Sequence, residues 1–174
     1  MGIAHAPLVG HGLGGTVSLL TALTYPQRVD SLALISTPIH GAALALPVRL
    51  AASRPAVTLL LKAFQLTRAA SRWSARATCR DLRLANIIEA DLSRATLDSF
   101  LTSIASMRQT DLRRRLDQIH QPVLGVYANR DMIVSPRQWK TLKKGAAHAQ
   151  IVRYPKAGHF IMLDEPRACM QALK

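Results

Sequence analysis

Short apolar runs alternate with helix-like segments along most of this chain. Residues 13–24 place apolar side chains at the spacing of an amphipathic helix, and Pro26 ends that segment. A dense apolar run suits a strand that is buried on both faces of a parallel sheet. Four such runs occur, at 7–9, Val29–Ile35, 122–127 and Gln150–Tyr154. Since helical segments separate most of them, the pattern predicts an α/β fold of about four parallel strands flanked by helices.

The middle of the chain has a different character. Residues 41–111 are rich in Ala, Leu and Arg and contain no convincing strand. We therefore expect a helical insertion that lies over the sheet. Within it, one series of arginines recurs every four residues and shares a helical face, which must be solvated or meet an anionic partner. The series consists of Arg68, Arg72, Arg76 and Arg80.

Length and composition indicate one folded domain over residues 1–174. Apolar residues make up 49% of the chain and charged residues 19%, which excludes intrinsic disorder. No apolar run is long enough for a membrane span, and no signal peptide is visible at Met1. Cys79 and Cys169 lack metal-ligand spacing, so we interpret them as free thiols of a cytoplasmic protein.

The chain has a formal net charge of +13, which bears on the kind of partner it could bind. Such a charge favours anionic partners, among them nucleic acid or an acidic membrane surface. Aromatic residues, however, amount to 5% and do not interleave with the basic ones, as a surface for single-stranded nucleic acid would require. We favour solvated basic faces as the explanation.

Candidate chemistry lies where the predicted strands end. The stretch PLVGHGLGG predicts a strand, a very tight turn centred on Gly12, and a helix. Asp131 follows the third strand and His159 follows the fourth. Carboxyl ends of parallel strands meet at one edge of a sheet, so these positions should converge. An acid and then a histidine after such a turn is the order of a nucleophile–acid–base triad, in which the carboxylate orients the imidazole.

Several segments together resemble the α/β-hydrolase family. They are PLVGHGLGG, YPQRVDSLALIST, PVLGVYANRDMIV and AGHFIMLDEP. The resemblance implies that Asp131 is the triad acid, that His159 is the base, and that the Leu13 N–H donates to the oxyanion. It also implies a helical cap at 41–111 and an ester or related carbonyl substrate, without a metal or cofactor. The esterase, lipase and carbon–carbon hydrolase branch is the most similar.

Two departures from the family pattern lower the expected activity. Gly12 occupies the position of the nucleophilic serine, so an acyl-enzyme cannot form there. The family fold also has further strands ahead of the elbow strand, so the sequence resembles the C-terminal part of a hydrolase, truncated at its N-terminus. We expect a hydrolase that is impaired or inactive. The first strand would then be an exposed apolar edge that can pair with another polypeptide.

Two other interpretations remain open. Gly10, Gly12 and Gly15 match the dinucleotide-binding pattern G-x-G-x-x-G, but Asp30 stands at the wrong end of the next strand to bind a ribose. Alternatively, the chain is a non-catalytic interaction protein that binds an acidic partner through its arginine face. His11, inside the turn, is interpreted as a packing residue rather than as a base.

Overall fold

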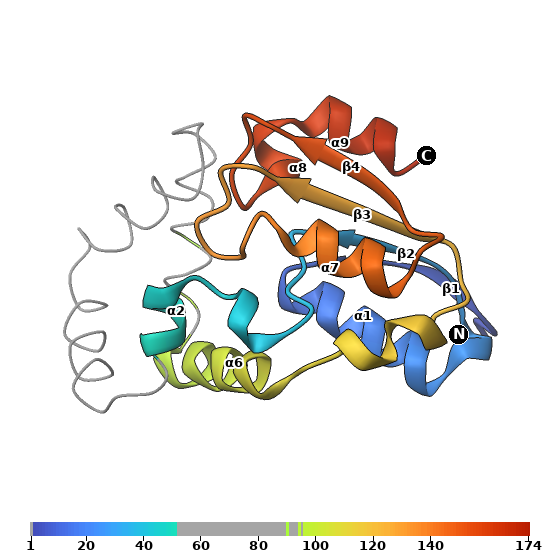
Figure 1. The fold of residues 1–174 in the computed structure, drawn as a ribbon, viewed down its shortest axis with the longest axis horizontal. Helices are drawn as coiled ribbons and strands as arrows, with labels where there is room; N and C mark the ends of the chain where they lie inside the picture. Colours follow the sequence, from blue (N-terminus) through green and yellow to red (C-terminus); the bar gives the residue numbers. More distant parts are fainter. Residues whose placement is uncertain (1, 52–89, 91–93, 95) are drawn as a thin grey trace.

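Four parallel strands form the centre of the computed structural model (Figure 1). The structure describes residues 2–51, 90, 94 and 96–174, so the arginine series, Cys79 and much of the expected insertion lie outside the described residues. The sheet order follows the chain order, and each neighbouring pair is parallel, as predicted. The strands are β1 (Ala6–His11), β2 (Val29–Ile35), β3 (Val123–Ala128) and β4 (Gln150–Tyr154).

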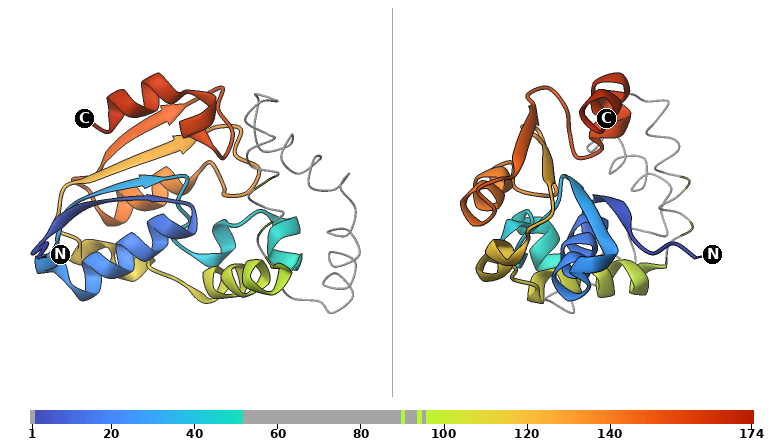
Figure 2. Two further views of the ribbon diagram at one scale, coloured as in Figure 1. Left: turned by 180° about the vertical axis from the view of Figure 1, so that it is seen from behind. Right: turned by 90° about the vertical axis from the view of Figure 1, so that its right-hand side faces the viewer.

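Helices cover both faces of the sheet (Figure 2). On one face lie α1 (Leu13–Thr24), the 3-10 turn η3 (Arg113–Gln118) and α7 (Gln138–Gly145). On the other face lie α8 (Ile161–Asp164) and α9 (Pro166–Ala172), over β3 and β4. A further 3-10 turn, η1 (Pro26–Arg28), joins α1 to β2. Among the described helices, none has the length and hydropathy required to cross a membrane.

Alternation along β3 explains how one strand contributes to both layers. Val123 and Tyr127 pack in the core beneath α1 and α7, whereas Val126 and Ala128 pack beneath α8 and α9. Successive side chains of a strand point to opposite faces, so an uninterrupted apolar run fills both. A buried valine side chain, such as that of Val123 or Val126, contributes about 1.5–3 kcal/mol to the free energy of unfolding.

Most of the described residues of the 41–111 segment lie in helices or a 3-10 turn. These elements are η2 (Gly41–Ala43), α2 (Leu46–Ala51) and α6 (Leu97–Gln109). Thr96 caps α6, because its side-chain oxygen accepts the N–H of Ser99 at 3.2 Å. Leu44 and Ile104 pack against Val134, which joins this segment to the loop after β3. That the segment acts as a cap over a substrate stays a prediction.

One edge of the sheet is β1. Its side chains alternate in exposure, and Val9 is 61% exposed. Val17, on the following helix, is 52% exposed. β1 is thus an edge strand of the sheet that the structure describes, and its pairing with another polypeptide stays a prediction.

Candidate active site

The turn after β1 has the geometry that its glycines predict. Gly12 is the N-cap of α1 and has φ 54° and ψ −120°, a backbone conformation that side chains with a Cβ rarely adopt. Its N–H donates to the carbonyl oxygen of Ile35 at 2.9 Å, and its own carbonyl accepts the N–H of Gly15 at 3.1 Å. The chain thus passes from strand to helix within one residue, next to the end of β2.

Close backbone packing explains two neighbouring glycines. A Cβ on Gly10 would stand 2.5 Å from the carbonyl carbon of Gly14. A Cβ on Gly15 would overlap Oγ1 of Thr37 and stand 2.7 Å from its Cγ2. At Gly14, by contrast, a Cβ would meet nothing within 4 Å. The start of α1 therefore packs directly on β1 and on the exit of β2, and Gly10 and Gly15 allow that approach.

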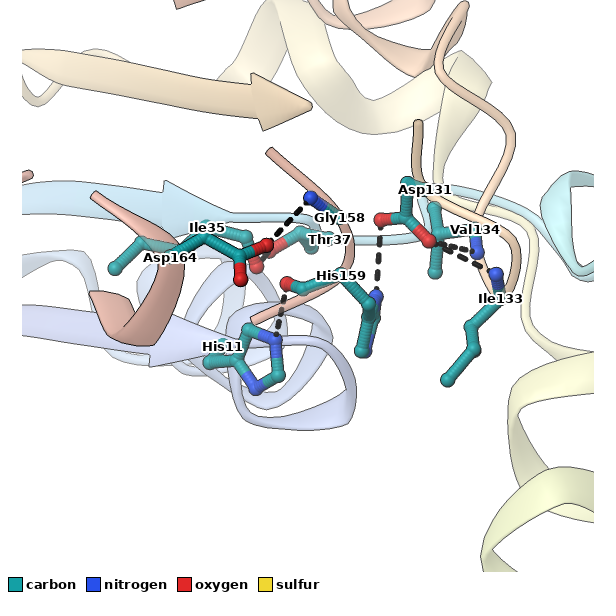
Figure 3. A network of polar contacts seen from close by, with 9 residues as sticks. All are labelled: His11, Ile35, Thr37, Asp131, Ile133, Val134, Gly158, His159 and Asp164. Atoms are coloured by element: carbon teal, nitrogen blue, oxygen red, sulfur yellow. Dashed lines mark hydrogen bonds and ion pairs between the residues drawn. The ribbon is translucent and has the colours of Figure 1, made fainter. Parts of the chain in front are cut away.

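Asp131 and His159 form a buried pair at the carboxyl end of the sheet (Figure 3). His159 Nδ1 donates to Asp131 Oδ2 at 2.9 Å, and the residues are 6% and 8% exposed. Asp131 Oδ1 accepts the backbone N–H groups of Ile133 at 2.9 Å and of Val134 at 2.8 Å. These two bonds fix the carboxylate, so that Oδ2 points at the imidazole. Because Oδ2 accepts the proton on Nδ1, the neutral ring of His159 carries its proton on Nδ1.

The other ring nitrogen of His159 faces the turn. A Cβ built on Gly12 would lie 3.6 Å from His159 Nε2 and 3.9 Å from Cε1. The structure thus brings together Gly12, Asp131 and His159, the three positions that the sequence predicted to converge. Leu13 is the first residue of α1, where a backbone N–H has no partner within the helix, and no acceptor for it occurs among the described residues.

His11 supports the loop that carries His159. Its Nε2–H donates to the carbonyl oxygen of His159 at 3.1 Å, and the two ring centroids are 4.5 Å apart. Burial, with a smaller contribution from the nearby His159, lowers the pKa of His11 to about 4, so the ring is neutral at pH 7. This geometry fits the packing role expected for His11.

Asp164 holds the same loop from its other side (Figure 3). Its Oδ2 accepts the N–H of Gly158 at 2.7 Å. Neither this bond nor the His11 bond was predicted. The His11 bond joins residues 148 apart in the chain, and the bond to Gly158 depends on the short helix α8 folding back toward its own preceding loop. No local sequence pattern specifies contacts of either kind.

The alternative dinucleotide site lacks its acidic residue near the turn. Asp30 lies at the start of β2, and its carboxylate pairs with His5 at 2.6 Å. The ring of His159 stands over Gly12, at the place where a bound pyrophosphate would lie. Gly15, the third glycine of that pattern, is explained by its approach to Thr37. These observations favour the hydrolase-type turn.

A family model described as "alpha/beta hydrolase fold" matches residues 1–166. The chain belongs to the α/β-hydrolase fold family. A pimeloyl-[acyl-carrier protein] methyl ester esterase of Neisseria meningitidis is 30% identical, over 94% of this chain and 66% of that protein. The dihydrolipoyllysine-residue acetyltransferase component of the acetoin cleaving system of Pseudomonas putida is also 30% identical, over 93% of this chain and 42% of its own length.

Solved structures agree on the fold of this α/β-hydrolase. A hydrolase from Pseudomonas aeruginosa superposes with a TM-score of 0.80 at 23% identity, over 98% of this chain and 64% of that one. An esterase from Exiguobacterium antarcticum gives 0.74 at 19% identity, over 96% and 64%. These four proteins match nearly all of this chain, whereas the chain spans between 42% and 66% of their own lengths.

Proposed function

We propose that this chain carries the acid–base half of an ester-hydrolase site and that covalent catalysis through residue 12 is absent. The observation that carries the proposal is the position of His159 Nε2, 3.6 Å from where a Cβ of residue 12 would be. A hydroxyl on that carbon would come within hydrogen-bond reach of the imidazole, the arrangement that activates a nucleophile. Glycine offers no such hydroxyl. Hydrolysis by the acyl-enzyme route is therefore lost.

The roles of the surrounding groups follow from their contacts. His159 is proposed as the base, and Asp131 as the carboxylate that orients it and stabilises its protonated form. The Leu13 N–H is proposed as a donor to the oxyanion. The carboxylic ester substrate is inferred from the esterase relative, whose name states a methyl ester. Ester hydrolysis by this chain is accordingly proposed to be impaired.

The test is to restore the missing hydroxyl. In Gly12→Ser, a fluorophosphonate probe should label residue 12, and hydrolysis of p-nitrophenyl acetate should exceed that of Gly12→Ala by about 10²-fold, the lower end of what a base contributes when it activates a positioned hydroxyl. Gly12→Ala is the matched control, because it has the same Cβ in the same rarely populated backbone conformation, which costs about 1–3 kcal/mol. It should not be labelled.

A second control separates activation from accessibility. Gly12→Ser combined with His159→Ala keeps the hydroxyl but removes the base, so labelling should fall to the level of Gly12→Ala. If folded Gly12→Ser is neither labelled nor faster than Gly12→Ala, His159 is not positioned to activate residue 12 and the proposal is wrong.

A further inference from the structure

A Cβ on Gly12 would point toward the ring of His159. It would have only the His159 ring within 4 Å, and its nearest atom is Nε2 at 3.6 Å. This is ordinary van der Waals distance, so a Cβ at that point meets no clash and an oxygen atom beside it would lie next to the imidazole. The unpartnered N–H of Leu13, at the start of α1, borders the same region.

His159 has the properties of a base rather than of a structural histidine. Its Nδ1–H is taken by Asp131, so in the neutral ring the lone pair is on Nε2. Although the residue is 6% exposed, Nε2 has no hydrogen-bond partner among the described residues. Nε2 is therefore free to accept a proton, as the base of a triad must be. His11 shows the contrast, since its Nε2–H is bonded to a carbonyl oxygen.

We infer that a water molecule takes the place of the missing hydroxyl and that His159 activates it for direct attack on an ester. The inference rests on the proposed function, because it uses the same acid–base pair. Water oxygen bonds to the carbonyl carbon while one of its protons passes to His159 Nε2. The resulting oxyanion accepts the N–H of Leu13, and the imidazolium is stabilised by Asp131. The intermediate then breaks its bond to the alcohol oxygen, which takes the proton from Nε2. Acid and alcohol are released, and no group is attached to the protein.

The substrate class follows from the missing covalent step. Water is a weak nucleophile, and within the described residues one backbone N–H is identified for the oxyanion. Such a site hydrolyses esters with a good leaving group, such as aryl esters, much faster than alkyl esters, the class to which a methyl ester belongs. p-Nitrophenyl acetate is therefore the probe, and ethyl acetate is the slow comparison.

The experiment uses the full chain and two histidine variants. His159→Ala should lower the hydrolysis of p-nitrophenyl acetate by about 10²-fold, the contribution of a general base. His120→Ala is the matched control, because His120 is exposed just ahead of β3, at the opposite end of that strand from Asp131, and should leave the rate unchanged. Thermal unfolding followed by circular dichroism checks that each variant is folded. If His159→Ala does not fold, His159→Gln, which keeps a polar side chain of similar length, replaces it.

The absence of a covalent intermediate provides a second readout. The unmodified chain should release p-nitrophenol without a burst, and mass spectrometry of quenched reactions should find no added acetyl group. A rate that is unchanged in His159→Ala, or an acetylated protein that turns over, overturns the inference.

The two proposals can fail separately. If Gly12→Ser is labelled while the unmodified chain shows no turnover that depends on His159, the acid–base assignment stands and the water mechanism is wrong. If Gly12→Ser is also inert, both are wrong.

Discussion

Adding a methyl group should destabilise the protein at Gly15 but not at the adjacent Gly14. In Gly15→Ala the new Cβ would overlap Oγ1 of Thr37 and stand 2.7 Å from its Cγ2 and 2.8 Å from its Cβ. Thr37 is fully buried, so its side chain has no open space to rotate into, and the backbone of Thr37 or the start of α1 must shift. Overpacking of this kind costs about 3 kcal/mol, the upper part of the usual range. For a chain of this size, the melting temperature should fall by about 6–12 °C.

Gly14→Ala is the matched comparison, because its Cβ would meet nothing within 4 Å. Replacing an exposed helical glycine by alanine adds about 0.5–1 kcal/mol of stability, which raises the melting temperature by about 1–4 °C. Thermal unfolding followed by circular dichroism measures both variants. Adding Thr37→Ala to Gly15→Ala should recover part of the loss, because it removes the two atoms that clash most. The reasoning is refuted if Gly15→Ala melts within 2 °C of Gly14→Ala.

Two further predictions concern buried polar rings. The pKa of His11 is lowered from 6.5 to about 4, so between these values the unfolded chain binds a proton that the folded chain does not. When the pH falls from 7 to 4.5, the free energy of unfolding of the unmodified chain should therefore decrease by about 2–3 kcal/mol more than that of His11→Gln. Urea unfolding at several pH values measures both, and the same pH dependence in the two proteins would contradict the prediction. The buried Tyr127 hydroxyl has no hydrogen-bond partner within the described part of the chain. Tyr127→Phe should thus add up to about 1 kcal/mol of stability, whereas the exposed Tyr25→Phe should change it by less than about 0.5 kcal/mol, and a destabilised Tyr127→Phe would indicate an unseen partner.

Local patterns were sufficient for the elements around the site. The helical spacing over 13–24 and the apolar run over Val29–Ile35 match the observed α1 and β2 to the residue. Both are regular, strongly patterned segments with a proline or glycine boundary, so burial and propensity favour the same structure. The run over 122–127 was displaced by one residue from the observed β3, because sheet pairing rather than apolarity determines where a strand ends.

The glycine cluster was predictable as a turn but not in its detail. Its flanking strand and helix indicated a tight connection, and the structure adds that the backbone of Gly12 has a positive φ. That Gly15 is required and Gly14 is not depends on Thr37, which follows a different strand. Sequence spacing cannot distinguish the two, since both lie in the same helical turn. The distinction comes from how closely α1 packs on the exit of β2.

The amino-acid sequence by itself determined that an acid and a histidine follow parallel strands after a turn whose centre has no side chain. Since carboxyl ends of parallel strands share one edge, this order was enough to predict that Gly12, Asp131 and His159 converge. Only the tertiary structure decided that Asp131 Oδ1 is held by two N–H groups, that His11 supports the loop of His159, and that Nε2 faces Gly12. Those contacts depend on loop conformations and on which strands are neighbours, and a hydrogen bond between residues 28 or 148 apart leaves no periodic trace in the chain.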